Sequence, residues 1–266
     1  MRSARPVMSR TGTLLTIAGY DPSGGAGVLT DTLVFRGLGY HGAAVLTALT
    51  VQNTRRVAKV YSLRAGQVRE QYEALRRDLS WRGIKTGMIG SAENLRLVGR
   101  ILEENASIPR VVDPVLRSSS GTPLLEPKAV SRFLAEVKGR ATLLTPNLGE
   151  ASLLTGRPVR SLDDMRRAAA VLFEKTRVPC LIKGGHLPGP VADLLFDGRD
   201  FRLYRHRRIK ASVHGTGCYL SAALLGFLAD GRPLDRACGL AIGLTLRAIG
   251  RARRPGLGRP VTAITL

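Results

Sequence analysis

Residues 214–231, HGTGCYLSAALLGFLADG, place two glycines, a threonine and a cysteine directly before an apolar run with helical spacing. A Gly-x-Gly turn allows several backbone N–H groups to face one anion, and the dipole of the following helix favours negative charge there. Gly215, Thr216 and Gly217 are therefore candidates for an anion-binding turn. The same field would favour the thiolate of Cys218, so this thiol is either a reactive group or a small residue that packs under the turn. From the residues alone both interpretations stay open.

A second set of candidates follows the predicted strands. These residues are Asp21, Gln52, Asn53, Met88, Asp113, Asn147, Glu150 and Lys183. In a parallel sheet the carboxyl ends of the strands share one edge, where ligands bind, so we expect these side chains to converge. Carboxylates hold Mg²⁺, usually through water, while lysine and backbone amides neutralise phosphoryl oxygens. Each residue alone could simply belong to a turn or a loop, and the GxxxxGK[ST] phosphate loop is absent, but together they predict phosphoryl transfer.

The elements that must position these residues alternate along the chain. Strands with their exit turns are predicted at 13–19, 42–54, 83–90, 110–115, 141–147 and 178–185, and a hairpin at 191–209. Helices are predicted at 28–39, 65–81, 92–104, 162–176 and 235–250. This alternation predicts one α/β domain over residues 1–266, with a central, mainly parallel sheet and helices on both faces. The ends, 1–12 and 252–266, are expected to be peripheral tails.

Length and composition agree with a single soluble globular domain. A chain of 266 residues with 44% hydrophobic content can bury one large core. No stretch approaches the roughly 20 apolar residues of a membrane helix, and we see no signal peptide, so a cytoplasmic protein with no membrane partner is expected. Cys180, Cys218 and Cys238 are widely spaced without a CxxC pair. This spacing excludes a disulfide framework and argues against zinc.

The charge of the chain is strongly positive. Lys and Arg number 41 against 20 Asp and Glu, a net charge of +21, and basic stretches occur at 204–210 and 251–259. One interpretation is a non-catalytic, basic nucleic-acid-binding protein. However, Arg is spread through nearly every predicted helix and no nucleic-acid-binding module is recognisable, which favours a solvated surface. We therefore do not expect nucleic acid as a partner, and the charge also suits a pocket for phosphates.

Seven motifs together resemble one known family. They are IAGYDPSGGAG, ALTVQNT, KTGMIG, VVDPVLRSSSGTPLL, LLTPNLGEASLLTG, IKGGH and HGTGC, in this order from about residue 13 to about 250. They resemble the hydroxymethylpyrimidine/phosphomethylpyrimidine kinases of thiamine biosynthesis, which have the ribokinase-like fold. The resemblance implies ATP- and Mg²⁺-dependent phosphorylation of 4-amino-5-hydroxymethyl-2-methylpyrimidine and then of its monophosphate, commonly by a homodimer. A pyridoxal kinase of the same superfamily is the nearest alternative, and Gln52 favours the aminopyrimidine.

The resemblance also implies roles for particular residues. Cys218 would be the general base beside the acceptor hydroxyl, and Gly215, Thr216 and Gly217 would form the anion hole for the transferring phosphoryl group. It assigns substrate binding to Gly19, Asp31, Gln52, Met88 and Val115, the metal to Asp113 and Glu150, and ATP phosphate binding to Asn147 and Lys183. The chain departs from the usual family pattern at Tyr20, Leu33 and Val213 and in the tail at 251–266, which lacks a Gly/His-rich ending. We expect these departures to affect the pocket rim and the handling of the monophosphate rather than the reaction class.

Overall fold

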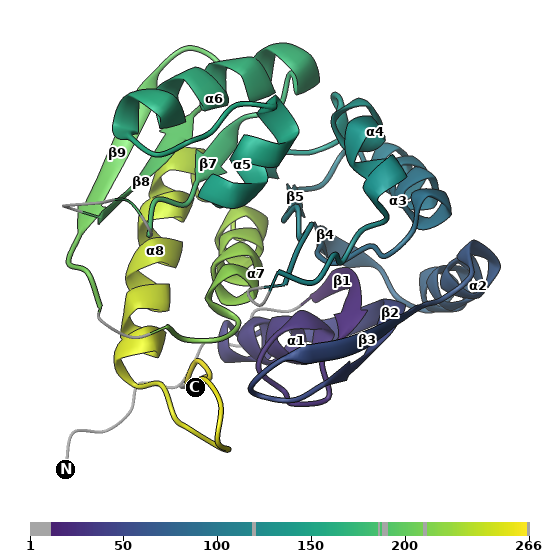
Figure 1. Ribbon diagram of the computed structural model, residues 1–266. Coiled ribbons are helices and arrows are strands. Elements are labelled where there is room, and N and C mark those ends of the chain that lie inside the picture. Colours follow the sequence, from purple (N-terminus) through teal and green to yellow (C-terminus); the bar gives the residue numbers. More distant parts are fainter. Residues whose placement is uncertain (1–11, 119–120, 186, 188–190, 210–211, 265–266) are drawn as a thin grey trace.

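Strands and helices alternate along the chain in the computed structural model, which describes residues 12–118, 121–185, 187, 191–209 and 212–264 (Figure 1). The strands are β1 (Thr13–Tyr20), β2 (His41–Gln52), β3 (Val57–Ser62), β4 (Trp81–Thr86), β5 (Arg110–Val112), β6 (Leu143–Leu144), β7 (Cys180–Ile182), β8 (Val191–Phe196) and β9 (Phe201–His206). The helices are α1 (Gly27–Gly37), α2 (Ala65–Arg76), α3 (Ala92–Glu104), α4 (Pro127–Val137), α5 (Leu148–Thr155), α6 (Leu162–Thr176), α7 (Thr216–Ala229) and α8 (Leu234–Gly250).

All described strands belong to one sheet in the order β3-β2-β1-β4-β5-β6-β7-β8-β9. The strands from β2 to β7 in this order run parallel, which confirms the predicted mainly parallel sheet. β3 pairs antiparallel with β2 at one edge, and β8 and β9 form the predicted antiparallel hairpin at the other. The sequence did not lead us to expect β3, α4 or α5, although α4 has a clear apolar face formed by Ala129, Phe133, Leu134 and Val137.

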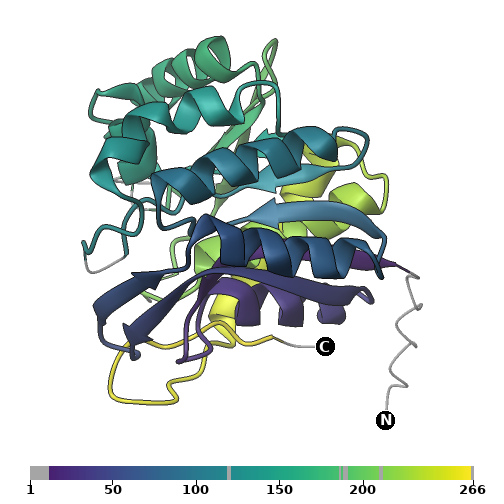
Figure 2. The ribbon, with the colours of Figure 1, turned by 90° about the vertical axis from the view of Figure 1, so that its right-hand side faces the viewer.

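Helices cover both faces of the sheet, as Figures 1 and 2 show. Helices α2 to α6 share one hydrophobic core with Leu15 and Ile17 of β1, and α1, α7 and α8 share the other with Leu14. Successive side chains of a strand point to opposite faces, so β1 is apolar almost throughout because both of its faces are covered. The ligand-binding edge of the sheet is thereby held between two rigid layers.

Helix α7 begins within the Gly-rich turn identified in the sequence and holds this turn in place. It packs against α1, α8 and the strands β4 and β5, and its residues 219–226 are all buried. A helix enclosed in this way is apolar on every side, which explains its continuous hydrophobic run. Within the part of the chain that the structure describes, no helix combines the length and hydrophobicity needed to cross a membrane.

Candidate active site

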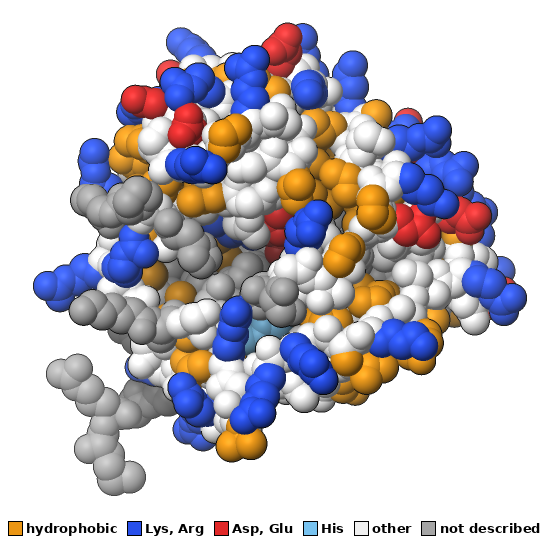
Figure 3. All heavy atoms as spheres, viewed as in Figure 1, with side chains coloured by type: hydrophobic (Ala, Val, Ile, Leu, Met, Phe, Trp, Pro, Cys, Tyr) orange, Lys and Arg blue, Asp and Glu red, His pale blue; other side chains and the backbone are white. Residues whose placement is uncertain are grey.

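A cavity of about 420 Å³ opens where the carboxyl ends of the parallel strands meet. Figure 3 shows this face of the molecule hollowed near its centre. The structure brings nearly all of the predicted site residues to this cavity. Its lining includes Gly19, Gln52, Met88, Asp113, Val115, Asn147, Glu150, Lys183, Gly215, Thr216, Gly217 and Cys218. The convergence follows from the parallel topology, which gathers the loops after β1, β2, β5, β6 and β7 at one edge.

The turn before α7 depends on a very close approach of two backbone segments. Gly215, the N-cap of α7, has a φ of +81°, and a Cβ there would lie 1.7 Å from the carbonyl oxygen of Gly25. The first N–H groups of a helix have no partner within the helix, so those of α7 are available to an anion in the cavity. A Cβ on Gly217 would lie 3.2 Å from Nζ of Lys183. An anion at this turn would therefore meet the helix N-terminus and a lysine together.

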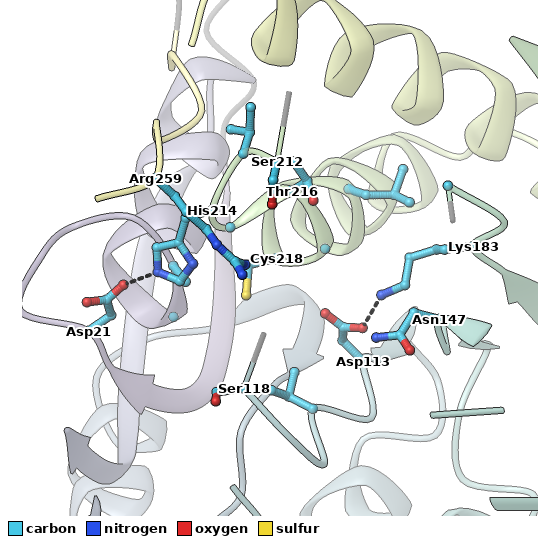
Figure 4. A pocket seen from close by; sticks show the side chains of 18 of the residues that line it. Asp21, Asp113, Ser118, Asn147, Lys183, Ser212, His214, Thr216, Cys218 and Arg259 are labelled. Atoms are coloured by element: carbon cyan, nitrogen blue, oxygen red, sulfur yellow. Dashed lines mark hydrogen bonds and ion pairs between the residues drawn. The ribbon is translucent and has the colours of Figure 1, made fainter. Parts of the chain in front are cut away.

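Lys183 and Asp113 form an ion pair on one side of the cavity, with 2.8 Å between Nζ and Oδ1 (Figure 4). Thr145 donates a hydrogen bond to Oδ1 of Asp113, and Ser221 donates one to Oδ2. Burial acts to raise the pKa of Asp113, but the nearby lysines and these hydrogen bonds outweigh it and lower the pKa below its usual value. Burial acts to lower the pKa of Lys183, and Asp113 and Glu150 reverse this, so its pKa is raised. Both groups are charged at neutral pH.

Asn147 and Glu150 have a structural role as well as a place in the cavity. Oδ1 of Asn147 accepts from the N–H of Glu150 at 2.9 Å, and Oε2 of Glu150 accepts from the N–H of Asn147 at 2.8 Å. This capping box fixes the start of α5. Burial, opposed by Lys183 and assisted by the charge of Asp113, raises the pKa of Glu150 to about 7. The Glu150 carboxyl therefore gains or loses its proton close to neutral pH.

Cys218 lies in the first turn of α7 and lines the cavity. Burial raises the pKa of its thiol to about 11, and the ammonium of Lys85 offsets only part of this effect. Desolvation therefore has a larger effect on the pKa of this thiol than the positive charge near it. At neutral pH Cys218 is a thiol in nearly every molecule.

Asp31 is not among the residues that line the cavity, and its contact with the pyrimidine stays a prediction. Its side chain and that of Lys85 are both 0% exposed, and Nζ of Lys85 lies 2.7 Å from each carboxylate oxygen. Thr16 donates a further hydrogen bond of 2.7 Å to Oδ2. The Asp31 carboxylate holds the pKa of Lys85 above its usual value against the effect of burial. Asp31 is thus one half of a buried ion pair that joins α1 to β4, beneath the cavity.

His214, which the site assignment did not include, links the turn before α7 to Asp21 of the Gly-rich loop and to Gln52 at the end of β2. Nε2 of His214 lies 2.7 Å from Oδ2 of Asp21 and 3.1 Å from Nε2 of Gln52. Figure 4 shows His214 and Asp21 on the side of Cys218 away from Lys183. Burial acts to raise the pKa of Asp21, and hydrogen bonds from His214 and Ser23 lower it below its usual value. The sequence signal was the histidine directly before the GTGC motif.

The C-terminal segment also belongs to the site, although residues 252–266 were expected to be peripheral. Val261 pairs with His214 and with Arg253, and the N–H of Arg259 donates to the carbonyl oxygen of Thr54 at 2.9 Å. Arg259 lines the cavity, and its side chain reaches toward Cys218 (Figure 4). Arg259 is thus the residue of 252–264 that lines the cavity, while 1–11 and 265–266 lie outside the described residues.

The helix N-terminus and Lys183 give this cavity the means to hold a transferring phosphoryl group, and the mainly parallel sheet with helices on both faces is that of the ribokinase-like phosphotransferases. The sequence profile of the family described as phosphomethylpyrimidine kinase matches residues 21–262. The chain belongs to this kinase family, which confirms the resemblance seen in its motifs. Family membership favours a phosphate-handling explanation of the positive charge over a nucleic-acid one.

Individual relatives agree with this assignment. The chain is 37% identical over 246 residues to the hydroxymethylpyrimidine/phosphomethylpyrimidine kinase of Aquifex aeolicus (strain VF5), covering 92% of this chain and 96% of that protein. It is 39% identical over 256 residues to the Thiamine biosynthesis bifunctional protein ThiED of Geobacter sulfurreducens, covering 95% of this chain and 52% of that protein. The solved structure of the pyridoxal kinase of Staphylococcus aureus in complex with AMP-PCP has a TM-score of 0.86 and 31% identity, covering 94% of this chain and 92% of that one.

Proposed function

We propose that this kinase transfers the γ-phosphoryl group of ATP to the hydroxymethyl oxygen of 4-amino-5-hydroxymethyl-2-methylpyrimidine, and then phosphorylates the monophosphate to the diphosphate, in thiamine biosynthesis. The observation that carries the proposal is a single cavity that joins a phosphate-binding turn and Lys183 to a compartment containing the carboxamide of Gln52. The names of the relatives described above support the same substrate and pathway.

Gln52 supports an aminopyrimidine as the acceptor. A carboxamide offers both a donor and an acceptor, which match a ring nitrogen and an exocyclic amine. Met88, Val115 and Gly19 provide apolar walls, and a Cβ on Gly19 would lie 2.8 Å from Sδ of Met88, so glycine lets Met88 pack closely on β1. A buried polar group left without a partner costs about 1–3 kcal/mol, so this compartment discriminates against rings that lack the amine.

We propose that the ATP phosphates lie between Lys183 and the turn before α7, with Mg²⁺ near Asp113 and Glu150. These two carboxylates and the Asn147 carboxamide are oxygen donors of the kind that Mg²⁺ prefers. Among the described residues no group of three or more His, Cys, Asp and Glu side chains is placed to hold a metal. Such a sparse donor set fits an ion that keeps several waters and binds through one or two carboxylates and the substrate phosphates. When bound, Mg²⁺ would neutralise charge on the phosphoryl oxygens.

The residues of the chain contribute in distinct ways to the proposed reaction. Lys183 and the first N–H groups of α7 stabilise negative charge on the transferring group, and this electrostatic stabilisation supplies most of the rate acceleration. Cys218 is the proposed base, whose thiolate accepts the proton of the attacking hydroxyl. Because the pKa of Cys218 is about 11, the reactive thiolate is a small fraction of the enzyme at neutral pH. The proposed reaction should therefore accelerate in alkali.

Pyridoxal is the second candidate acceptor, and the structural similarity to a pyridoxal kinase is the observation that favours it. A coupled assay of ADP release with the pyrimidine, its monophosphate and pyridoxal separates the candidates. We expect kcat/KM for the pyrimidine to exceed that for pyridoxal at least about tenfold, which corresponds to one discriminating buried hydrogen bond. The variant Gln52→Leu should lose most of this preference. Faster turnover of pyridoxal by the wild type would overturn the assignment of the substrate.

We also propose that the enzyme is a cytoplasmic homodimer. Leu49, Val51 and Tyr61 are between 41% and 50% exposed on the β2–β3 ribbon, and an exposed apolar group of this kind supports an interface between two copies. Cys180, Cys218 and Cys238 are all free, which suits a reducing compartment. Light scattering on wild type and Val51→Glu tests the dimer: we expect the variant to be monomeric, and a monomeric wild type would contradict the proposal.

A further inference from the structure

We propose that Arg259 is a specificity-determining residue that binds the phosphate of the second acceptor, the pyrimidine monophosphate. The guanidinium would then raise kcat/KM for the anionic monophosphate relative to kcat/KM for the neutral alcohol. The inference rests on the proposed function, because it places the acceptor beside Gln52 and Cys218. It concerns a residue from the C-terminal segment, which departs from the usual ending of the family.

The backbone around Arg259 is fixed on one side by the loop after β2. The N–H of Arg259 donates to the carbonyl oxygen of Thr54 at 2.9 Å, and the N–H of Gly258 donates to Oγ1 of Thr54 at 3.1 Å. A Cβ at position 258 would lie 2.1 Å from the same carbonyl oxygen, so only glycine allows this approach. The segment is therefore held against the loop after β2, and these contacts fix the backbone position of Arg259.

The other side of the segment is fixed by the turn before α7. The N–H of His214 donates to the carbonyl oxygen of Pro260 at 2.8 Å, and Val261 forms a parallel bridge with His214. A Cβ on Gly25 would lie 2.9 Å from Cγ1 of Val261, which shows how closely the segment packs on the Gly-rich loop. The segment that contains Arg259 is thus held against the turn that leads into α7 and Cys218.

Two cations that line the cavity lie on different sides of the turn before α7 (Figure 4). Lys183 lies with Asp113 at one end of the cavity, whereas the Arg259 side chain points into the cavity from the side of His214 (Figure 4). The nearby carboxylate of Asp21 is bound by His214 and Ser23. A monoester acceptor brings a second dianion beside Cys218 while ATP phosphates occupy the Lys183 end, and this repulsion needs a separate cation. The planar guanidinium of arginine can donate two hydrogen bonds to the phosphate group, whereas the alcohol has no anionic group to accept them.

The test compares kcat/KM for the monophosphate and for the alcohol in wild type, Arg259→Gln and Arg259→Lys. We expect Arg259→Gln to lower the monophosphate-to-alcohol ratio about 10- to 100-fold, the range for a lost hydrogen bond to a charged group, and Arg259→Lys to lower it less. Arg254→Ala is the matched control, since this exposed arginine of the same segment does not line the cavity. It should leave the ratio at the wild-type value. An unchanged ratio in Arg259→Gln, or an equal loss on both acceptors, would overturn the inference.

Calorimetric titration of the alcohol and the monophosphate in the absence of ATP separates this inference from the proposed function. If the wild type turns over neither acceptor, the proposed function fails. Binding then decides the role of Arg259: tighter binding of the monophosphate than of the alcohol that is lost in Arg259→Gln supports it, and equal binding by wild type and variant contradicts it. Gly258→Ala, which displaces the segment from Thr54, should show the same loss of preference while keeping the arginine.

Discussion

At the scale of single residues, the environment of a side chain decides its chemical state more than its place in a motif. Burial raises the pKa of Cys180 and Cys238 to about 12 and that of Cys218 to about 11. What distinguishes Cys218 is therefore access to the cavity rather than an acidic thiol. Lys183 and Asp113 show the opposite outcome, because each stabilises the charge of the other against burial.

Removal of the Cys218 thiol should show whether it is the base. We expect Cys218→Ala to lower kcat about 10²- to 10⁴-fold, the usual contribution of a general base, with the remaining rate due to electrostatic stabilisation. Steady-state kinetics with the pyrimidine measures this effect. Cys238→Ala, at a buried thiol in the core, should retain kcat within about threefold. Near-wild-type turnover of Cys218→Ala would leave the anion-binding turn as the important part of the site.

The raised pKa of Cys218 also predicts an alkaline pH dependence. Below a pKa of about 11 the thiolate fraction increases tenfold with each pH unit, so kcat should increase with a slope near one on a logarithmic scale. Measurement between about pH 8 and 9.5 avoids the titration of Glu150 near pH 7. The rate of alkylation by iodoacetamide should rise in parallel. A flat profile for kcat together with rising alkylation would exclude the thiolate as the base.

At the scale of elements, the site depends on backbone segments that touch more closely than side chains would allow. The carbonyl oxygen of Gly25 meets Gly215, and the carbonyl oxygen of Thr54 meets Gly258. These contacts hold the Gly-rich loop, the start of α7 and the C-terminal segment together around the cavity. Glycine at these positions is thus required by tertiary contact and not by local turn geometry alone.

The Gly215 contact can be tested by adding one methyl group. Gly215→Ala should lower the free energy of unfolding by more than about 2 kcal/mol and abolish most activity, because left-handed strain adds to a clash with backbone. Gly231→Ala is the matched control: its φ is +75°, but nothing lies within 4 Å of its Cβ position. It should cost only about 1–2 kcal/mol. Equal losses in denaturant titrations of the two variants would show that the contact with Gly25 is unimportant.

The pair of Asp31 and Lys85 joins α1 to β4, so its disruption should act on stability. We expect Asp31→Ala to lower the free energy of unfolding by about 3–5 kcal/mol, since it leaves a buried ammonium without its partner. The double variant Asp31→Leu with Lys85→Met should recover much of this loss. Chemical denaturation measures both effects. A normally stable Asp31→Ala protein with a raised KM for the pyrimidine would support the role in substrate binding predicted for Asp31.

At the scale of the whole molecule, the net charge of +21 extends to the cavity where phosphates would enter. Lys and Arg side chains are distributed around the face shown in Figure 3 and do not form one stripe. Several basic residues nevertheless line the cavity, namely Arg55, Arg56, Arg117, Lys183, Arg207, Arg208 and Arg259. These basic residues outnumber the acidic residues of the lining, which are Asp21, Asp113, Glu150 and Asp193, and a net positive lining attracts anionic ligands.

This electrostatic attraction should depend on ionic strength. The Debye length falls from about 30 Å at 0.01 M to about 8 Å at 0.15 M, so kcat/KM for ATP should fall several-fold over this range. The neutral pyrimidine provides the control, because its kcat/KM at saturating ATP should change less than about twofold. Steady-state kinetics in sodium chloride and in sodium acetate should agree at equal ionic strength. If kcat/KM for ATP is constant with salt, the charge has no role in attracting it.

The sequence by itself determined the parallel sheet, its helices and most members of the site. Hydrophobic bursts that alternate with amphipathic stretches specify a βα architecture, and the parallel order then places every strand-end residue at one edge. Asp113, Asn147, Lys183 and the turn at 215–218 could be predicted in this way. Local pattern sufficed because the position of these residues follows from where a strand ends or a helix begins.

Only the tertiary structure decided the roles that depend on contacts between distant segments. The partner of Asp31 lies 54 residues away on another strand, Val261 reaches His214 across 47 residues, and no periodicity encodes either contact. The pKa of Cys218 likewise depends on how deeply packing buries the sulfur, which a motif does not specify. Pattern in a sequence reports which face of an element is apolar. Which side chains meet, and how dry their surroundings are, is settled only when the elements pack.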